Sequence, residues 1–417
     1  MSKKIKVGIF GVGRGMYLAR SIMLANGEIV ALCDFHAGRL AKASAELPDV
    51  AAYDSFDAFI EHEGLEAVVL ANFFHEHAPF AIRCLEKGIH VFSECTAGGT
   101  LAECVELVRA AEKSDAVYML AENYPFMIFN QELRRLCDGG SLGKILYAEG
   151  EYNHPTDPVD TSFYKDYIYS VDHWRNFLPR SYYVTHSLAP LMYATGASPK
   201  RVTAMATFDE PKADVPTARR VGDKATVMMT QNDDGSIFRF TGCAAFGGHH
   251  NAYRVCGTSG SVENIRGAGA RMILHYNKWS CPEGSDEVKE YNPTWHESPE
   301  LVELIERTGH GGGDFLVCRE FLETIRNGRK AAFPFDVYSA TRMSATAILA
   351  HRSMLEGGKP YDIPDFRVEA DRKLYENDRI TPIPGANGEA PTIPCCSVVD
   401  YSPSESQIEG FKKLIAD

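Results

Sequence analysis

A glycine-rich segment near the N-terminus has the residue types of a phosphate-binding loop. Gly11, Gly13 and Gly15, with Arg14 among them, stand between an apolar run and a helix-like stretch. Glycines here let the backbone approach a pyrophosphate, and the start of a helix attracts its negative charge. Met16 stands where the third glycine of the usual Gly-x-Gly-x-x-Gly motif would be. On this motif alone, a tight strand-to-helix turn is the preferred interpretation.

An acidic residue further along the chain favours a dinucleotide site over a simple strand-to-helix turn. Asp34 ends the second apolar run, 23 residues after Gly11. A carboxylate at this place hydrogen-bonds a ribose 2′-hydroxyl and repels a 2′-phosphate, which favours NAD over NADP. Arg39 could weaken that preference for NAD, but a solvated helix residue is the preferred interpretation. The order strand, glycines, helix, strand and acid therefore predicts a dinucleotide site.

The elements that would position these residues alternate between strand and helix. Short continuous apolar runs separated by helices predict a parallel sheet covered on both faces, which is a doubly wound α/β domain. We expect this NAD-binding Rossmann domain to span residues 1–124. The expected strands are Lys6–Phe10, Ile29–Cys33, Ala67–Ala71, His90–Ser93 and Val117–Ala121, and the expected helices are Met16–Ala25, Gly38–Glu46, Glu76–Lys87 and Leu101–Lys113.

A second domain of α+β type is expected over residues 125–375, with a mainly antiparallel sheet. Its expected helices are Pro125–Cys137, Phe315–Asn327 and Val337–Glu356, and its expected strands are Ile145–Asn153, Arg201–Phe208, Ala225–Gln231, Ile237–Gly242, Tyr253–Gly257 and Arg271–His275. Residues 376–417 contain several prolines and little periodicity, which predicts an extended C-terminal tail.

The bulk composition narrows the class of protein. With 417 residues and 45% hydrophobic content the chain can form two large cores. A net charge of −13 argues against a nucleic-acid partner, because phosphates need a basic surface. No apolar run is long enough for a bilayer, and no signal segment precedes the first strand, so we expect no membrane partner. The 11 cysteines lack a repeated spacing, which is typical of a reducing, cytoplasmic protein.

The segment 89–96, which ends in Glu94-Cys95-Thr96, resembles part of the sugar-oxidising Gfo/Idh/MocA oxidoreductases. In that family the run usually ends Glu-Lys-Pro, and the lysine helps to move the substrate proton. The resemblance implies that Glu94 contacts the nicotinamide ribose and that Asn72 lines the cofactor path. It also implies that Asn123 lies near the carboxamide and that His77 occupies a family histidine position.

Several of these polar residues could instead have purely structural roles. Asn72 and Asn123 could simply cap strand ends. His75 and His77 could ligate a metal, but no further ligand spacing accompanies them, so we expect none. Cys95 has no cationic neighbour in sequence that would activate its thiol as a replacement for the lysine.

A later segment resembles one branch of this family, the NAD-dependent glycosidases of the α-N-acetylgalactosaminidase type. Tyr183-Val184-Thr185-His186 is similar to the Tyr-Pro-Thr-His segment of that branch, with Tyr182 in place of the aspartate common elsewhere. The resemblance covers residues 4–366 and implies that His186 and Tyr183 are catalytic. Three further stretches agree with it: Glu151-Tyr152-Asn153-His154, His310-Gly311-Gly312-Gly313-Asp314-Phe315 and Asp362-Ile363-Pro364-Asp365-Phe366.

The chemistry that this branch implies needs several acid/base groups. A base such as His186 removes a hydroxyl proton while hydride leaves the sugar carbon, and a tyrosine can be that base only if its pKa is lowered. Oxidation at carbon 3 makes the carbon 2 hydrogen acidic, so that the carbon 1 substituent can leave before water adds and the hydride returns. Candidate substrate contacts are His154, Glu149, Glu151, His249 and Trp174.

These candidates have structural alternatives as well. Glu149 and Glu151 alternate with small residues, as on a solvated strand face, and Trp174 could be a core residue. His249 could be a polar strand end, and His310 could satisfy a helix start. The overall prediction is an enzyme that holds NAD and acts on a sugar or glycoside, either as a net dehydrogenase or as a redox-neutral glycosidase. The family also implies a homo-oligomer, and a non-catalytic nucleotide sensor on the same fold remains the alternative.

Overall fold

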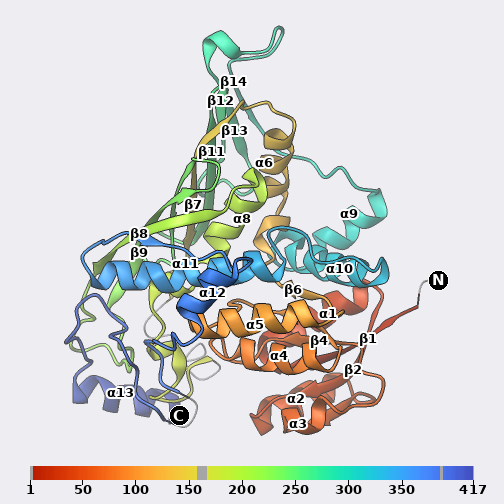
Figure 1. Cartoon of the computed structure of the whole chain (residues 1–417), viewed down its shortest axis with the longest axis vertical. Helices are drawn as coiled ribbons and strands as arrows, with labels where there is room; N and C mark the ends of the chain where they lie inside the picture. The colour runs from red at the N-terminus through yellow and green to blue at the C-terminus, as the bar shows by residue number, and fades with distance from the viewer. Residues whose placement is uncertain (1–2, 157–166, 386–387, 417) are drawn as a thin grey trace.

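The computed structural model describes residues 3–156, 167–385 and 388–416, which form two sheets side by side (Figure 1). The first sheet has the order β3-β2-β1-β4-β5-β6, and every pairing in it is parallel. This is the Rossmann order, so the predicted doubly wound domain is confirmed. Its strands are β1 (Ile5–Phe10), β2 (Gly27–Cys33), β3 (Ala51–Tyr53), β4 (Ala67–Leu70), β5 (His90–Ser93) and β6 (Tyr118–Leu120).

Helices cover both faces of this sheet. Alternate side chains of β1 pack toward α1, whereas those of β4 and β5 on the other face pack toward α4 and α5. The short β3 and α3 were not predicted, because neither has an apolar run long enough to stand out from a loop. The helices of this part are α1 (Val12–Leu24), α2 (Ala37–Glu46), α3 (Phe56–Phe59), α4 (His77–Glu86) and α5 (Leu101–Lys113).

The second sheet is mainly antiparallel, as predicted, with the order β14-β13-β12-β11-β7-β10-β9-β8-β15. Within this second sheet, the pairing of β10 with β7 is the only parallel one among the described strands. Its strands are β7 (Ile145–Asn153), β8 (Pro199–Phe208), β9 (Asp223–Asn232), β10 (Ile237–Thr241), β11 (His250–Gly257), β12 (Gly260–Asn264), β13 (Met272–Tyr276), β14 (Val288–Tyr291) and β15 (Tyr361–Asp362).

Helices of the second part cover one face of this sheet and also reach the first domain. Gly150 on β7 faces α8 so closely that a Cβ atom would overlap the Ser187 carbonyl. α10 packs on α1, and Phe321 of α10 stacks on Phe92 of β5 at 4.7 Å between ring centroids. The helices are α6 (Ile128–Asp138), α8 (Thr185–Thr195), α9 (Pro299–Glu306), α10 (Gly313–Arg326), α11 (Val337–Leu355), α12 (Glu369–Tyr375) and α13 (Glu405–Ala416). Short 3₁₀ turns are η1 (Tyr124–Phe126), η2 (Trp174–Asn176), η3 (Arg180–Tyr182), η4 (Lys278–Ser280) and η5 (His310–Gly312).

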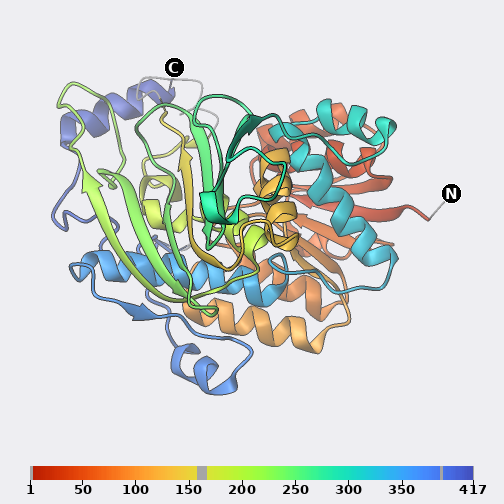
Figure 2. The same ribbon diagram turned by 90° about the horizontal axis from the view of Figure 1, so that it is seen from above.

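The chain after α12 returns to the second domain instead of leaving it. It runs along one side of the molecule and ends in α13 (Figures 1 and 2). The buried Asp223 accepts a hydrogen bond from the Ser397 backbone at 2.9 Å, and Phe411 of α13 packs on Ile168 and Ala218. The sequence prediction of an extended tail did not include α13. Its amphipathic pattern was obscured by the proline-rich residues before it.

Among the described residues, no helix is long and apolar enough to cross a membrane.

Candidate active site in the interdomain cleft

The glycine loop has the geometry of a dinucleotide cradle. Gly11 has a φ of 90°, and a Cβ atom there would overlap the Ala71 carbonyl, so only glycine fits. A Cβ atom on Gly15 would overlap Ile9, which shows that this glycine lets α1 approach β1. Gly13 faces open space instead. The structure thus separates two packing glycines from one that leaves room for a ligand.

Asp34 is anchored where a ribose would lie. Its two carboxylate oxygens accept hydrogen bonds from the backbone N–H groups of Val12, at 2.9 Å, and His36, at 2.8 Å. These bonds fix the carboxylate beside the first turn of α1. Each oxygen retains a second lone pair, so Asp34 can still accept a hydrogen bond from a hydroxyl group.

A cavity of 710 Å³ begins at this loop and extends between the two domains. One wall is the Rossmann domain, and the other is formed by residues 167–175 of the second part. Asn72 lines the cavity, and its amide nitrogen and oxygen are both buried without a hydrogen-bond partner in the described chain. A buried amide lacking partners is costly, and the polar edges of a dinucleotide would satisfy it. These features fit NAD.

An ion-pair cluster lies at the inner end of the glycine loop. Arg14 donates from Nε to Glu94 at 2.8 Å and forms a bidentate pair with Asp314, whose carboxylate also accepts from the Asn123 amide at 2.7 Å. His310 donates to the same carboxylate at 2.9 Å. Burial alone would raise the pKa of Asp314, but the bonds from His310 and Arg14 hold it well below its ordinary range. Asp314, at the start of α10, therefore ties both domains together beside the predicted nicotinamide end.

His186 lies on the first turn of α8 and is held from both ring nitrogens. Its Nδ1 is 2.8 and 2.9 Å from the two carboxylate oxygens of Glu122, and its Nε2 is 3.3 Å from the Tyr183 hydroxyl. An ionised carboxylate only accepts hydrogen bonds, so Nδ1 carries a proton. In the neutral imidazole, Nε2 then has a lone pair that can accept a hydrogen bond from Tyr183 or a proton from a substrate.

Glu122 is fully buried at the end of β6. Burial works to raise the pKa of Glu122, but the charge and the hydrogen bond of His186 outweigh it and lower that pKa. Glu122 therefore stays ionised and stabilises a positive charge on His186. The Cys95 thiol also donates to Glu122, at 3.1 Å. Burial and the carboxylates of Glu122 and Glu94 raise the pKa of Cys95, so this residue is a thiol and not a base.

Aromatic rings fix the plane of the His186 imidazole. Tyr124 stacks on it with ring centroids 3.9 Å apart and an angle of 11°, and Tyr152 meets it edge-on at 4.9 Å. The hydroxyl of Tyr253 donates to the backbone carbonyl of His186. The imidazole is thus confined by stacking, by a carboxylate and by its helix.

Tyr183 does not meet the condition for a tyrosine base. Burial, and then the charge of Glu94, raise its pKa well above the ordinary value. The hydroxyl keeps its proton and can donate to Nε2 of His186 or to a substrate oxygen. The two predicted catalytic side chains therefore have opposite abilities, with His186 able to accept a proton and Tyr183 able to donate a hydrogen bond.

The predicted substrate contacts separate into two groups. His154 and His249 have ring centroids 4.6 Å apart, and the ring of Tyr152 connects His154 to His186. Trp174 lines the cleft wall but is only 7% exposed and stacks on Phe74. The tryptophan therefore shapes the wall more than it offers a face to a sugar.

Glu149 and Glu151 are not brought to the cleft. Gly150 between them faces α8, so the two glutamates point to the opposite face of the sheet. There they pair with Arg239, at 2.7 and 3.2 Å, and Glu151 also pairs with Arg266. They form a charged cross-strand network on the face of the sheet away from His186, and the alternation of β7 is the reason.

His75 and His77 also lie apart from any cluster of metal ligands. His77 is fully buried and its Nδ1 lies 3.0 Å from the Thr96 carbonyl, which requires that nitrogen to donate. Burial lowers the pKa of His77 and holds the ring neutral. No group of three or more histidine, cysteine or acidic residues with metal-binding geometry occurs in the described parts of the chain.

Sequence reasoning missed two residues of this site, Glu122 and Asp314, as functional groups. Glu122 was visible only as an acid next to Asn123, and its partner is 64 residues away in sequence. Asp314 belongs to a glycine-rich family motif, but nothing local indicates that it binds Arg14, 300 residues away. Both became recognisable only when the fold brought the two domains together.

The fold and the cleft define a two-domain dinucleotide-binding protein in which a histidine of the second domain pairs with a carboxylate of the first. Residues 5–122 match the family described as oxidoreductase family, NAD-binding Rossmann fold, and residues 193–370 match the glycosyl hydrolase 109 C-terminal domain. The chain is therefore similar to the Gfo/Idh/MocA oxidoreductases in its first domain and to the glycosyl hydrolase 109 proteins in its second. Its first domain is an NAD-binding domain, as predicted.

Curated relatives extend over nearly the whole chain. A glycosyl hydrolase family 109 protein of Saccharopolyspora erythraea is 26% identical over 426 residues, covering 93% of this chain and 87% of the relative. An alpha-N-acetylgalactosaminidase of Bacteroides fragilis is 25% identical, covering 89% of this chain and 94% of the relative.

Solved structures show the same fold. A levoglucosan dehydrogenase in complex with NADH and levoglucosan superposes with a TM-score of 0.72 at 15% identity, covering 87% of this chain and 100% of that one. An aldose-aldose oxidoreductase from Caulobacter crescentus superposes with a TM-score of 0.68 at 18% identity and the same coverage. The arrangement of two domains around a cleft is therefore shared with sugar oxidoreductases.

Proposed function

We propose that the chain is an NAD-dependent enzyme that cleaves a glycoside without net oxidation, starting at a pyranose hydroxyl, at carbon 3. The observation that carries this proposal is His186, whose unprotonated Nε2 lies 3.3 Å from the Tyr183 hydroxyl at the boundary of the two domains, while Glu122 holds Nδ1. The histidine base is complete without the lysine that Cys95 replaces. Similarity to glycosyl hydrolase family 109 proteins supports a glycosidase over a net dehydrogenase.

The residues of the cleft divide the proton transfers. His186 would accept the hydroxyl proton at Nε2, and Glu122 would stabilise the imidazolium that forms. When bound, NAD would supply the hydride acceptor for the sugar carbon and return the hydride at the end of the turnover. Tyr183 would donate a hydrogen bond to the oxygen that becomes a carbonyl, because its hydroxyl keeps its proton.

A second acid/base group is needed to remove the carbon 2 proton and to assist the leaving group. His154 is the best placed of the predicted candidates, since Tyr152 links it to His186 and His249 lies against it. Burial, and then the neighbouring histidines, lower the pKa of His154, which favours a neutral ring able to accept a proton. Glu149 and Glu151 are left out of this scheme because they lie on the other face of the sheet.

We also propose a homo-oligomer formed through that other face. Met205, Met229 and Ile237 are exposed there, at 70, 46 and 40%, in a region where helices cover only the opposite face. Exposed apolar side chains grouped on one surface are typical of an interface. A cytoplasmic location is proposed as well, since all eleven cysteines lie in described parts of the chain and none is paired.

A panel of aryl glycosides and free sugars, offered with and without added NAD, tests this proposal against its two alternatives. The proposal predicts aglycone release with no accumulation of NADH absorbance. NADH formed in proportion to a free sugar would instead identify a net dehydrogenase. Nucleotide binding without any turnover on the panel would favour the sensor, the second candidate that the bare fold allows.

A further inference from the structure

The Glu122 carboxylate, which holds the proposed base, also accepts a hydrogen bond from a thiol. Its Oε1 accepts from the backbone N–H of Tyr124 at 3.1 Å and lies 2.8 Å from Nδ1 of His186. Its Oε2 lies 2.9 Å from the same Nδ1 and accepts from the Cys95 thiol at 3.1 Å. Glu122 is fully buried, so bulk water does not compete for these positions. The thiol and the histidine therefore share one carboxylate oxygen.

Cys95 is held in place by the loop that follows β5. Its backbone N–H donates to the Glu94 carboxylate at 3.3 Å, and the next side chain, Thr96, shares a hydrogen bond of 2.6 Å with Ser344 of α11. The Cys95 side chain is only 7% exposed and belongs to the hydrophobic core. Burial and the carboxylates of Glu122 and Glu94 raise the pKa of this thiol, so it keeps its hydrogen and remains a donor at ordinary pH.

A donor to one oxygen of a carboxylate changes what that carboxylate does for its other partner. The hydrogen bond from Cys95 stabilises the negative charge of Glu122, and this weakens the attraction of that charge for an imidazolium on His186. A thiol is a weak donor, so the effect is a partial withdrawal of charge and not the loss of the ion pair. The same bond restricts rotation of the carboxylate, which keeps both of its oxygens facing Nδ1.

We infer that Cys95 is a positioning residue for the base: its thiol holds Oε2 of Glu122 and so keeps the His186 imidazole less basic than Glu122 alone would make it. The inference rests on the proposed function for the role of His186. It extends that function by giving the residue at the position of the family lysine a task in proton transfer.

A redox-neutral cycle gives this adjustment a chemical purpose. His186 takes the hydroxyl proton when hydride leaves the sugar carbon, and it returns a proton to the same oxygen when the hydride comes back. Because the proton moves in both directions, an imidazole that is too basic would speed the first transfer and slow the second. Partial withdrawal of charge from Glu122 by Cys95 balances the two steps.

Other titratable and charged groups surround this pair and would contribute to a kinetic pH profile. Burial raises the pKa of several neighbouring hydroxyl and thiol groups, which therefore stay protonated near neutral pH: Tyr118, Tyr124, Tyr152, Tyr183, Tyr253 and Cys243. The surrounding groups that change or carry charge are Glu94, His154, His310, Arg14 and Asp314. The titration of the His186 ring has to be measured directly for this reason.

NMR of the NAD-loaded, full-length protein with ring-labelled histidine measures that titration, and the His186 signal is identified by its loss in His186→Ala. The pH midpoint of the ring should lie about 0.5 units or more higher in Cys95→Ala than in the unaltered protein, because the carboxylate then attracts the imidazolium more strongly. Cys95→Val fills the space without supplying a donor and should give the same upward shift. Cys95→Ser restores a donor and should bring the midpoint back toward the unaltered value.

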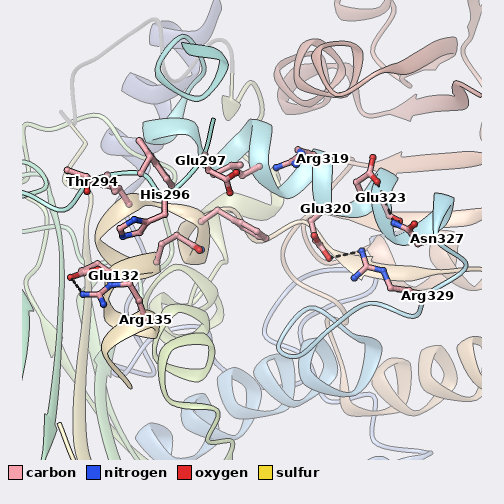
Figure 3. A pocket seen from close by; sticks show the side chains of 15 residues that line it. Glu132, Arg135, Thr294, His296, Glu297, Arg319, Glu320, Glu323, Asn327 and Arg329 are labelled. Carbon is pink, nitrogen blue, oxygen red and sulfur yellow. Dashed lines mark hydrogen bonds and ion pairs between the residues drawn. The ribbon is translucent and has the colours of Figure 1, made fainter. Parts of the chain in front are cut away.

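Cys84 provides a matched control, since it is also a buried thiol of the same hydrophobic core, on α4. Cys84→Ala should leave the His186 midpoint unchanged. His296 gives an internal reference, because it is an exposed histidine that lines a separate cavity of 510 Å³ between α6 and α10 (Figure 3). Its ring should titrate at the same pH in every variant.

Two results would overturn the inference. The first is a His186 midpoint that is unchanged or lowered in either Cys95→Ala or Cys95→Val. The second is an equal upward shift in Cys95→Ser, because packing at this position and not the donor would then set the midpoint.

The proposed function is tested separately by the acidic limb of kcat/KM on the best glycoside, which should move together with the His186 midpoint. A shifted midpoint without cleavage of any glycoside would leave the effect of Cys95 on His186 standing while contradicting the proposed function. The two failures are therefore distinguishable.

Discussion

His186 gains its proposed role from neighbours that no single segment contains. Glu122 comes from the end of β6, Tyr124 from the turn that follows, and Tyr183 from the loop before α8. Together they fix the tautomer, the plane and the direction of one imidazole ring. Pre-positioning of this kind lowers the reorganisation needed when a proton moves.

Removing the imidazole should therefore abolish turnover while leaving cofactor binding intact. His186→Ala is expected to lower kcat by about 10³-fold, and Glu122→Gln by about 10²-fold, because the second change removes only the supporting charge. Steady-state rates on the best glycoside, together with NAD content, measure both effects. His275→Ala, at an exposed position of β13, is the matched control and should behave as the unaltered protein. Full activity in His186→Ala would reject the assignment.

The sequence predicted some residues of this hydrogen-bond network, but it did not predict Glu122, which binds His186. His186 and Tyr183 were found through a short motif, and Glu94 and Asn123 through the resemblance to the Gfo/Idh/MocA oxidoreductases. Glu122 was not singled out, because a buried acid at a strand end has no local pattern that reveals a distant partner. The two glutamates on β7 were placed in the cleft because alternation identifies two faces without showing which face is covered.

Asp314 at the start of α10 links two elements that pack against each other, α10 and α1. Its carboxylate joins Arg14 of α1 to Asn123 and His310. Because the pKa of Asp314 is lowered in the folded protein, its contribution to stability is present above the ordinary value of 3.8. The contribution is lost as the pH falls through the folded value.

Asp314→Asn should cost about 3 kcal/mol of unfolding free energy at neutral pH, because Arg14 loses a charged partner. The cost should shrink as the pH falls below the ordinary pKa of 3.8, since the unfolded chain then binds a proton that the folded Asp314 does not take up. Urea unfolding of both proteins at about pH 6 and pH 3 measures the difference. A difference that does not depend on pH would show that the carboxylate's charge is not what stabilises this contact.

Residues 167–176 form a segment of the second domain that crosses the adenosine end of the cavity. Tyr169 meets the His36 ring at 5.5 Å, and the guanidinium of Arg39 lies over the Tyr169 ring at 5.0 Å. These contacts would have to open before a dinucleotide leaves. They suit an enzyme that keeps its cofactor through each turnover.

Tyr169→Ala should accordingly release NAD at least about tenfold faster than the unaltered protein, because two aromatic contacts across the cavity are lost. Displacement of bound NAD by an excess of a fluorescent analogue gives the rate. Trp279→Ala, an exposed aromatic residue in η4 that does not line the cavity, serves as a control for the loss of a surface ring. Equal release rates in Tyr169→Ala and the unaltered protein would mean that this segment does not retain the cofactor.

Element prediction succeeded where an apolar run is long and failed where it is short. The four-residue run of β5 was predicted with its observed bounds, whereas the three-residue β3, at the sheet edge, was overlooked. α8 was not predicted as a helix from its pattern, because nearly all its side chains are buried and it has no polar face. The proposed role of residues 167–176 in retaining the cofactor depends on tertiary packing, which a local sequence pattern does not predict.

In the second sheet, helices from the described parts of the chain cover one face and leave the other uncovered (Figure 1). Met205 and Met229 lie on the uncovered face, alongside the network of Glu149, Glu151 and Arg239. Apolar groups next to paired charges are typical of interfaces between copies of a chain.

Placing a charge in the apolar part of this face should therefore dissociate the proposed oligomer. Met205→Asp is expected to shift the sedimentation coefficient to that of a monomer, because an unpaired carboxylate would be buried between subunits. Leu374→Asp, on exposed α12, is a control at a similarly exposed apolar residue. A monomeric unaltered protein, or an unchanged oligomer in Met205→Asp, would contradict this interface.

The central claim is that cleavage proceeds through oxidation and elimination, with His186 as the first base. Cleavage of an active aryl glycoside in heavy water, followed by NMR of the released sugar, tests it most directly. The account predicts deuterium at carbon 2 of the product and no accumulation of NADH, because a proton leaves that carbon before water adds. Aglycone release with hydrogen fully retained at carbon 2 would contradict the account and indicate direct displacement at carbon 1.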